Sequence, residues 1–278
     1  MDENTEIIRN YYNEMVEHEW ARIAGRPEFL LTRRFLDRYA RPGDRVLDIG
    51  GGPGRYALYL AERGCDVTLF DLSGENVRFA SEQARERNLP LRAVTGDARA
   101  VDRAFEPQQF DHILLMGPMY HLLEEADRIQ AVEAALKLLK PGGVIFVSFI
   151  STFAGVIYEM TRAPECMTWT VPVEVEFRDC VLGQKSFAGD AFTKAFFIAQ
   201  QEVLPFMARF PLEKLHLLGQ EGILSPCEDN IMSQPPEVVS AWLDFAEKLC
   251  EREELLSWAE HLMYIGRKMA CKSRENSV

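Results

Sequence analysis

The stretch Arg45-Val-Leu-Asp-Ile-Gly-Gly-Gly-Pro-Gly54 decides the fold of this 278-residue chain. Its first half is a short apolar run bounded by glycines, which is typical of a buried strand. The glycines that follow allow a sharp turn, and without a Cβ atom they let a ligand approach the backbone closely. Residues 55–63 then have a helical pattern that ends at Gly64, so the loop opens a helix with its free amides. A ligand is therefore expected at this strand end.

The alternation of strands and helices continues to about residue 150. Apolar runs predict further strands, and amphipathic segments between them predict helices, the last of which Pro141-Gly142-Gly143 ends. This alternation is typical of an α/β fold with a doubly wound, parallel sheet and helices on both faces. The predicted strands cover residues 45–49, 66–70, 91–95, 110–116 and 144–149, and the predicted helices between them cover residues 55–63, 74–87 and 124–139.

The segments around this core are expected to elaborate it. Residues 5–20 carry one apolar helical stripe, and a second helix follows Pro27. Beyond residue 150 the pattern predicts helices over 195–208 and 236–258 and late strands over 213–219 and 261–266. We divide the chain into an N-terminal helical lid (1–43), a cofactor-binding core (44–150), a cap insertion and substrate region (151–212), and a C-terminal part of the core sheet with inserted helices (213–278).

Acidic residues follow three successive predicted strands. Asp48 precedes the glycine loop, Asp71 ends the second strand, and Asp97 follows the third in Gly96-Asp97-Ala98. The carboxyl ends of parallel strands meet at one edge of a sheet, so these three side chains are expected to share one crevice. If the ligand in this crevice is an adenine nucleoside, Asp71 can accept hydrogen bonds from both hydroxyls of its ribose. Asp97 can accept one from the amino group of its adenine.

Two cofactor classes use a loop of this kind. A dinucleotide requires Gly-x-Gly-x-x-Gly, because its pyrophosphate rests on the helix N-terminus. Counted from Gly50, the third glycine position holds Arg55; counted from Gly52 it holds Ala57, which that motif tolerates. An NAD-dependent oxidoreductase therefore stays open as an alternative. Asp48 would repel a pyrophosphate but suits the ammonium group of a methionine moiety, which favours a sulfonium cofactor without phosphates.

The run from Val46 to Leu60, with Asp71, Gly96-Asp97-Ala98 and Leu139-Lys-Pro-Gly-Gly143, resembles the class I S-adenosylmethionine-dependent methyltransferases. The segments 115–123 and 260–268 resemble a bacterial group of small-molecule methyltransferases within that family. The resemblance implies a Rossmann-like sheet of seven strands, mostly parallel, with an antiparallel last strand. It also implies an enzyme that uses S-adenosyl-L-methionine, releases S-adenosyl-L-homocysteine and methylates a small-molecule acceptor by in-line displacement. A non-catalytic regulatory protein that binds the cofactor remains a further alternative.

The resemblance also implies site residues. Met116 and Gly117 would flank the cofactor at the end of the fourth strand, and Tyr11 would close over the sulfonium from the N-terminal helix. His121 is a candidate base that takes a proton from the nucleophile, or it only packs there, and Tyr120 is a second candidate catalytic residue or shapes the pocket. The expected cofactor contacts are Tyr11, Asp48, Gly50, Gly51, Gly52, Gly54, Tyr56, Asp71, Leu72, Asp97, Ala98, Met116 and Gly117.

Other features of the sequence narrow the function further. The net charge of −12 disfavours nucleic acid as a partner. The cysteines are too far apart for a metal site or a redox dithiol, and no metal is expected. The aromatic residues of 151–195 predict an apolar cap over the acceptor, or the core of the added helices. His112 and His261 lie in expected strands and are predicted to be structural.

The first residues are acidic and polar, which is unlike a secretory signal. No apolar run approaches the roughly 20 residues of a membrane span. We therefore expect a cytoplasmic protein with no membrane partner, as a monomer or a homodimer.

Overall fold

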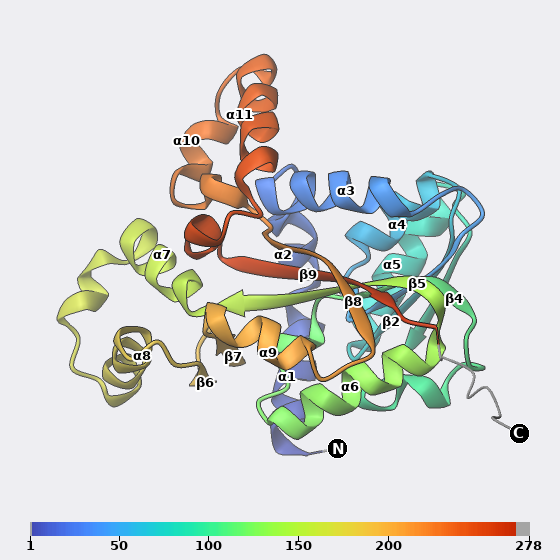
Figure 1. Cartoon of the computed structure of the whole chain (residues 1–278), viewed down its shortest axis with the longest axis horizontal. Helices are drawn as coiled ribbons and strands as arrows, with labels where there is room; N and C mark the ends of the chain where they lie inside the picture. The colour runs from blue at the N-terminus through green and yellow to red at the C-terminus, as the bar shows by residue number, and fades with distance from the viewer. Residues whose placement is uncertain (1, 271–278) are drawn as a thin grey trace, which may run out of the picture.

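A nine-stranded sheet runs through the part of the chain that the structure describes, with helices packed on its two faces (Figure 1). The computed structural model describes residues 2–270. Its first five strands are parallel and follow the order β3-β2-β1-β4-β5, which confirms the predicted doubly wound α/β fold. These strands are β1 Arg45–Ile49, β2 Asp66–Asp71, β3 Leu91–Thr95, β4 Phe110–Leu115 and β5 Leu139–Ser151.

The late strands extend the sheet beyond β5. Strand β9 lies antiparallel between β5 and β8, as the resemblance implies for the last strand. Because β9 runs opposite to β5, its first residue lies beside the carboxyl end of β5, and His261 pairs with Ile150. The bounds are β8 Leu212–Gly219 and β9 His261–Lys268.

The expected count of seven strands is wrong because a hairpin in the cap region adds two more. Strands β6 (Phe187–Asp190) and β7 (Lys194–Ile198) pair with each other, and β7 also pairs with Ile150 and Ser151 at the end of β5. The predicted helix over 195–208 is therefore wrong at its start. The long-range pairing with β5 overrides the helical spacing there, and helix begins only at η4 (Gln200–Glu202).

Helices cover the sheet on both sides, as a doubly wound fold requires. One face packs against α3, α4 and α5 through buried side chains that include Phe35 and Leu60. The other face packs against η1, α6 and α9 through Val101, Leu138 and Phe206. The bounds are α3 Pro27–Tyr39, α4 Arg55–Glu62, α5 Gly74–Glu86, η1 Ala98–Arg103, α6 Glu125–Leu138 and α9 Val203–Met207.

Two short helices at the N-terminus replace the single helix expected over residues 5–20. They are α1 (Glu3–Glu14) and α2 (Val16–Arg22), separated at Met15, whose backbone leaves the helical region with φ −101° and ψ 13°. Helix α3 buries Phe35 completely in the core. The N-terminal lid over residues 1–43 stays a prediction.

The cap region projects beyond the end of β5, at the left of Figure 1, and a second group of helices follows β8 at the top. No helix within residues 2–270 is long and apolar enough to cross a membrane. The cap consists of α7 Thr152–Arg162, η3 Pro164–Thr168 and α8 Pro172–Leu182, and the second group of η5 Gly222–Cys227, α10 Glu228–Met232, α11 Pro236–Leu249 and η6 Glu253–Trp258.

Candidate active site

A cavity of about 940 Å³ runs along the edge of the sheet where the parallel strands end. Ligand pockets commonly measure about 300–1,000 Å³, so this one has room for a cofactor and a second molecule together. All of the expected cofactor residues line it except Gly54, and so do Tyr120 and His121. The structure thus brings the three acidic strand ends into one cavity.

The glycine loop between β1 and α4 forms one wall of this cavity. Gly50 has φ +72°, and a Cβ atom there would lie 2.4 Å from Cδ of Pro118. Only glycine lets β1 and the segment after β4 approach so closely. Gly54 caps α4 with φ +91°, and its missing Cβ leaves room for Ala80. Gly54 therefore supports helix packing, and its expected contact with a cofactor stays a prediction.

Asp71 at the end of β2 holds the loop in place. One carboxylate oxygen accepts a hydrogen bond from the backbone of Gly52 at 2.8 Å, and the other accepts bonds from the backbone of Ser73 and the side chain of Asn76. Burial nevertheless raises the pKa of Asp71. The carboxylate thus joins the loop to the start of α5 and still lines the cavity.

Asp48 lies beneath the glycine loop, and it is almost completely buried. Burial and the neighbouring Asp71 carboxylate raise the pKa of Asp48 to about 7. Its Oδ2 atom has no hydrogen-bond partner within residues 2–270. A buried acceptor without a donor favours a cationic or N–H group in the adjoining cavity, so this residue fits an ammonium group well.

Asp97 is connected to the start of α1 through Arg99. Its carboxylate accepts bonds from Nε and Nη2 of the Arg99 guanidinium, the shortest at 2.6 Å, and one from the Arg99 backbone. The same guanidinium donates to Asp2 and Thr5 of the N-terminal segment. Asp97 therefore couples the third strand end to α1 while it faces the cavity.

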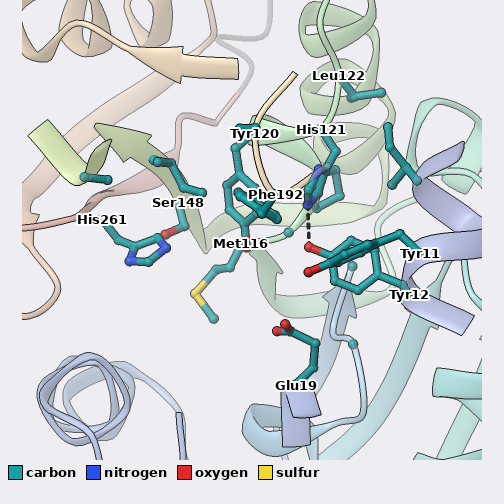
Figure 2. Close-up of a pocket in the computed structure, with 18 of the residues that line it drawn as sticks. Tyr11, Tyr12, Glu19, Met116, Tyr120, His121, Leu122, Ser148, Phe192 and His261 are labelled. Atoms are coloured by element: carbon teal, nitrogen blue, oxygen red, sulfur yellow. Dashed lines mark hydrogen bonds between the residues drawn. The ribbon is translucent and has the colours of Figure 1, made fainter. Parts of the chain in front are cut away.

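A hydrogen bond joins Tyr12 on α1 to His121, which follows η2 (Pro118–Tyr120), and both side chains line the cavity. Figure 2 shows the Tyr12 hydroxyl pointing at the imidazole, with Nε2 at 2.6 Å. Nδ1 of His121 lies 3.1 Å from the backbone oxygen of Lys194, which can only accept. Nδ1 therefore carries the proton, and Nε2 accepts from Tyr12.

Both ring nitrogens of His121 are thus engaged by the protein. Burial lowers the pKa of His121 to about 4, so the imidazole is neutral at physiological pH. Its assignment as a base stays a prediction, and in this arrangement its lone pair is already used by Tyr12. Tyr120 lies between His121 and His261 in Figure 2, with ring centroids 4.9 and 6.2 Å from theirs.

The far end of the cavity holds a polar group that the sequence interpretation missed. His261 lies in a strand, as predicted, but Nδ1 is 2.6 Å from the Glu221 carboxylate and the ring lines the cavity. Glu28 on α3 lines the same end and pairs with Arg22 at 3.1 Å. The signal available in the sequence was the position of His261 at the start of the last strand, since an antiparallel strand begins at the binding edge.

Residues 46–143 match the family described as a methyltransferase domain. Among curated proteins, a ubiquinone biosynthesis O-methyltransferase of Psychrobacter cryohalolentis is 37% identical over 113 residues, which cover 39% of this chain and 42% of that protein. A protein of the same name from Xanthomonas campestris is 33% identical over 116 residues, 41% of this chain and 46% of that protein. The alignments thus span less than half the length of these curated relatives.

Solved structures share the fold over most of the chain. The 1,6-didemethyltoxoflavin-N1-methyltransferase of Burkholderia thailandensis, solved with 1,6-didemethyltoxoflavin and S-adenosylhomocysteine, has a TM-score of 0.59 at 13% identity, covering 95% of this chain and 88% of its own. The PH0226 protein of Pyrococcus horikoshii has a TM-score of 0.56 at 17% identity, covering 90% and 91%. These similarities confirm the Rossmann-like architecture.

Proposed function

We propose that this chain, a member of the class I S-adenosylmethionine-dependent methyltransferases by its residues 46–143, transfers a methyl group to a small organic acceptor. The observation that carries the proposal is the single cavity that joins the three acidic strand ends to an apolar chamber under the cap. The bound cofactor supplies a methyl group already activated by a positively charged sulfur. The residues of the chain then have to bind and orient the two reactants and keep water away.

The cofactor end of the cavity suits S-adenosylmethionine in charge and in shape. Asp48 offers an unpaired buried carboxylate oxygen to an ammonium group, and Asp71 offers its carboxylate to ribose hydroxyls. Asp97 and Ala98 line the part of the wall where an adenine ring would lie. A pyrophosphate would instead meet the charge of Asp48 and Asp71, which makes NAD the weaker alternative.

The acceptor end is lined by aromatic side chains from the lid and the cap. These surfaces suit a small, largely planar molecule and leave little access for a macromolecule. The curated relatives carry names that place them in ubiquinone biosynthesis, which agrees with a small aromatic acceptor. Besides Tyr56 and Phe70, the aromatic residues that line the cavity are Tyr11, Tyr12, Tyr120, Tyr158, Trp169, Phe177, Phe187, Phe192 and Phe197.

Several finer assignments belong to the same proposal. The chain works without nucleic acid, since its net charge is −12 and its candidate acceptor site is an internal cavity. It acts in the cytoplasm, where reduced thiols such as those of Cys65 and Cys250 are stable. We propose a monomer or a homodimer as the active form.

The test is methyl transfer from labelled cofactor. The purified chain is incubated with S-adenosylmethionine carrying a tritiated methyl group and with a panel of phenols, catechols, amines and thiols. The proposal predicts label in at least one extracted small molecule, with S-adenosylhomocysteine formed in equal amount. Cofactor binding without transfer to any acceptor would instead favour the regulatory alternative, and binding of NAD alone would favour the oxidoreductase.

A further inference from the structure

The pair formed by His261 and Glu221 has the geometry of an oriented base. Glu221 follows β8, and its two carboxylate oxygens accept one bond from Nδ1 of His261 at 2.6 Å and one from the His261 backbone at 3.0 Å. Both residues are buried, with Glu221 3% and His261 8% exposed. This two-point contact fixes the plane of the imidazole and places the proton on Nδ1.

The second ring nitrogen is left for a ligand. Nε2 of His261 makes no hydrogen bond with any residue from 2 to 270, and the ring lines the cavity near Ser148 and Met116 (Figure 2). The Ser148 hydroxyl already donates to Gln220, which in turn donates to Thr32. At this end of the cavity Nε2 of His261 is therefore left to a ligand, and it is a base in the neutral form of the imidazole, whereas both nitrogens of His121 are engaged.

Charged groups from several elements surround this imidazole. Glu28 of α3, Glu221 and His261 have side-chain oxygen and nitrogen atoms within 4.8 Å of one another, and Arg22 of α2 pairs with Glu28. Glu260 lies next in sequence, and its carboxylate accepts a bond from Ser225. Tyr120 faces the ring from η2. Against the effect of burial, Glu28 and Glu221 raise the pKa of His261 to about 9.

We propose that Nε2 of His261 accepts the proton of an acidic hydroxyl on the acceptor, a phenol or an enol, and that Glu221 positions His261 for this step. The inference rests on the proposed methyl transfer and names its acceptor class. The O–H bond breaks as the proton moves to Nε2, and the oxygen lone pair forms the new bond to the methyl carbon. The electrons of the broken carbon–sulfur bond return to sulfur, which becomes neutral, and the imidazolium later releases its proton to water.

The basicity of the pair supports a phenol rather than an aliphatic alcohol. A phenol such as tyrosine ionises near pH 10, about one unit from the pKa of His261, so proton transfer between the two is nearly balanced. An aliphatic alcohol is far less acidic and would keep its proton. The aromatic walls formed by Tyr120, Phe187 and Phe192 also suit a ring that carries the hydroxyl.

The test uses 4-nitrocatechol, whose ionised form absorbs at longer wavelength than its neutral form. The probe is added to the full chain saturated with S-adenosylhomocysteine, about one pH unit below the first pKa of the free probe. His261 is already an imidazolium at that pH, so wild type is expected to bind the probe in the ionised form, paired with the imidazolium, while the proton of the probe is released to water. This ion pair is the same state that proton transfer to the neutral imidazole produces. His261→Asn is expected to bind it in the neutral form.

Two further variants separate the proposed roles from general effects on folding. Glu221→Gln removes the charge that favours the imidazolium, so the bound probe should ionise about one pH unit higher, a tenfold change in the ionised fraction. The matched control is His216→Asn, because His216 also pairs with a glutamate, Glu251 at 2.8 Å, but does not line the cavity. It should leave the spectrum unchanged. Should His261→Asn fail to fold, the wild-type spectrum and Glu221→Gln decide the question.

The outcomes that overturn the inference are distinct from those that overturn the methyltransferase itself. A bound probe that stays neutral in wild type, or ionises equally in His261→Asn, removes the role of His261. Failure of the probe to bind, while calorimetry shows S-adenosylhomocysteine bound, removes the hydroxyl acceptor class and leaves methyl transfer standing. Only failure of S-adenosylhomocysteine to bind would remove the proposed function as well.

Discussion

The hydroxyl of Tyr12 lies 2.6 Å from Nε2 of His121, and this contact joins the lid helix α1 to the segment after β4. Two further contacts hold the same helix, between Asn13 and Ser73 and between Thr5 and Arg99. Each joins α1 to a different part of the cofactor wall. Helix α1 is therefore held to the cavity wall at three separate points.

Replacing Tyr12 by Phe should loosen the lid. The variant loses one buried hydrogen bond and leaves His121 Nε2 without its donor, which costs about 1–2 kcal/mol of lid docking. Hydrogen exchange in residues 3–14 should become faster, with little change in β1 and β4. Tyr11→Phe is the matched control, because the Tyr11 hydroxyl makes no hydrogen bond within residues 2–270. Equal exchange in the Tyr12 variant and wild type would contradict this account.

Replacing Asp71 by Ala should weaken binding of S-adenosylhomocysteine by about 1–3 kcal/mol, because charge-assisted bonds to the ligand are lost. Part of that loss comes from the loop, since Gly52 also loses its acceptor. Titration calorimetry measures the change. Asp66→Ala serves as the control, because Asp66 begins the same strand at the opposite edge and is mostly exposed. Unchanged affinity in a folded Asp71 variant would refute the assignment.

Asp48 should make the ligand-free protein less stable as the pH rises. Its pKa is raised from 3.8 to about 7 in the folded state, so the folded state holds a proton that the unfolded chain releases. The contribution of Asp48 to stability is therefore greatest at and below about pH 4 and falls by up to about 4 kcal/mol as pH rises to about 7. Asp48→Asn lacks this dependence. Urea unfolding at pH 5 and pH 8 measures the free energy of unfolding of both proteins. An equal change between the two pH values in wild type and in Asp48→Asn would contradict the prediction.

The core of the site could be read from the sequence because its signals are local. Asp48 and the glycine loop are contiguous, and Asp71 and Asp97 each follow a strand that its apolar run defines. In parallel strands the carboxyl ends meet at one edge, so the topology alone brings the three acids together. All three line the cavity.

The parts that the sequence could not show depend on distant partners. Strand β7 forms because Phe197 and Ile198 pair with the end of β5, and the helical spacing of that segment gave no hint of it. Glu221 and His261 are far apart in sequence and meet only because β8 and β9 are antiparallel. The sequence predicted a structural role for His261 because the residue lies in an expected strand. Its contact with Glu221 could not be predicted from the sequence.

The pH dependence of methyl transfer offers a separate check on His261. Its folded pKa is raised to about 9, so the neutral base becomes more abundant as pH increases. With a phenolic acceptor, kcat/KM should therefore rise with pH and level off near pH 9. In His261→Asn the rise should follow the pKa of the free acceptor alone. A wild-type profile that levels off near pH 4 would point to His121 instead.

The most direct test of the central claim is a crystal structure of the chain with S-adenosylhomocysteine. The account predicts the ribose at Asp71, the adenine beside Asp97, and the amino group of the ligand next to Asp48. Electron density for the ligand elsewhere on the molecule, or a cavity without ligand density at saturating ligand concentration, would contradict the account.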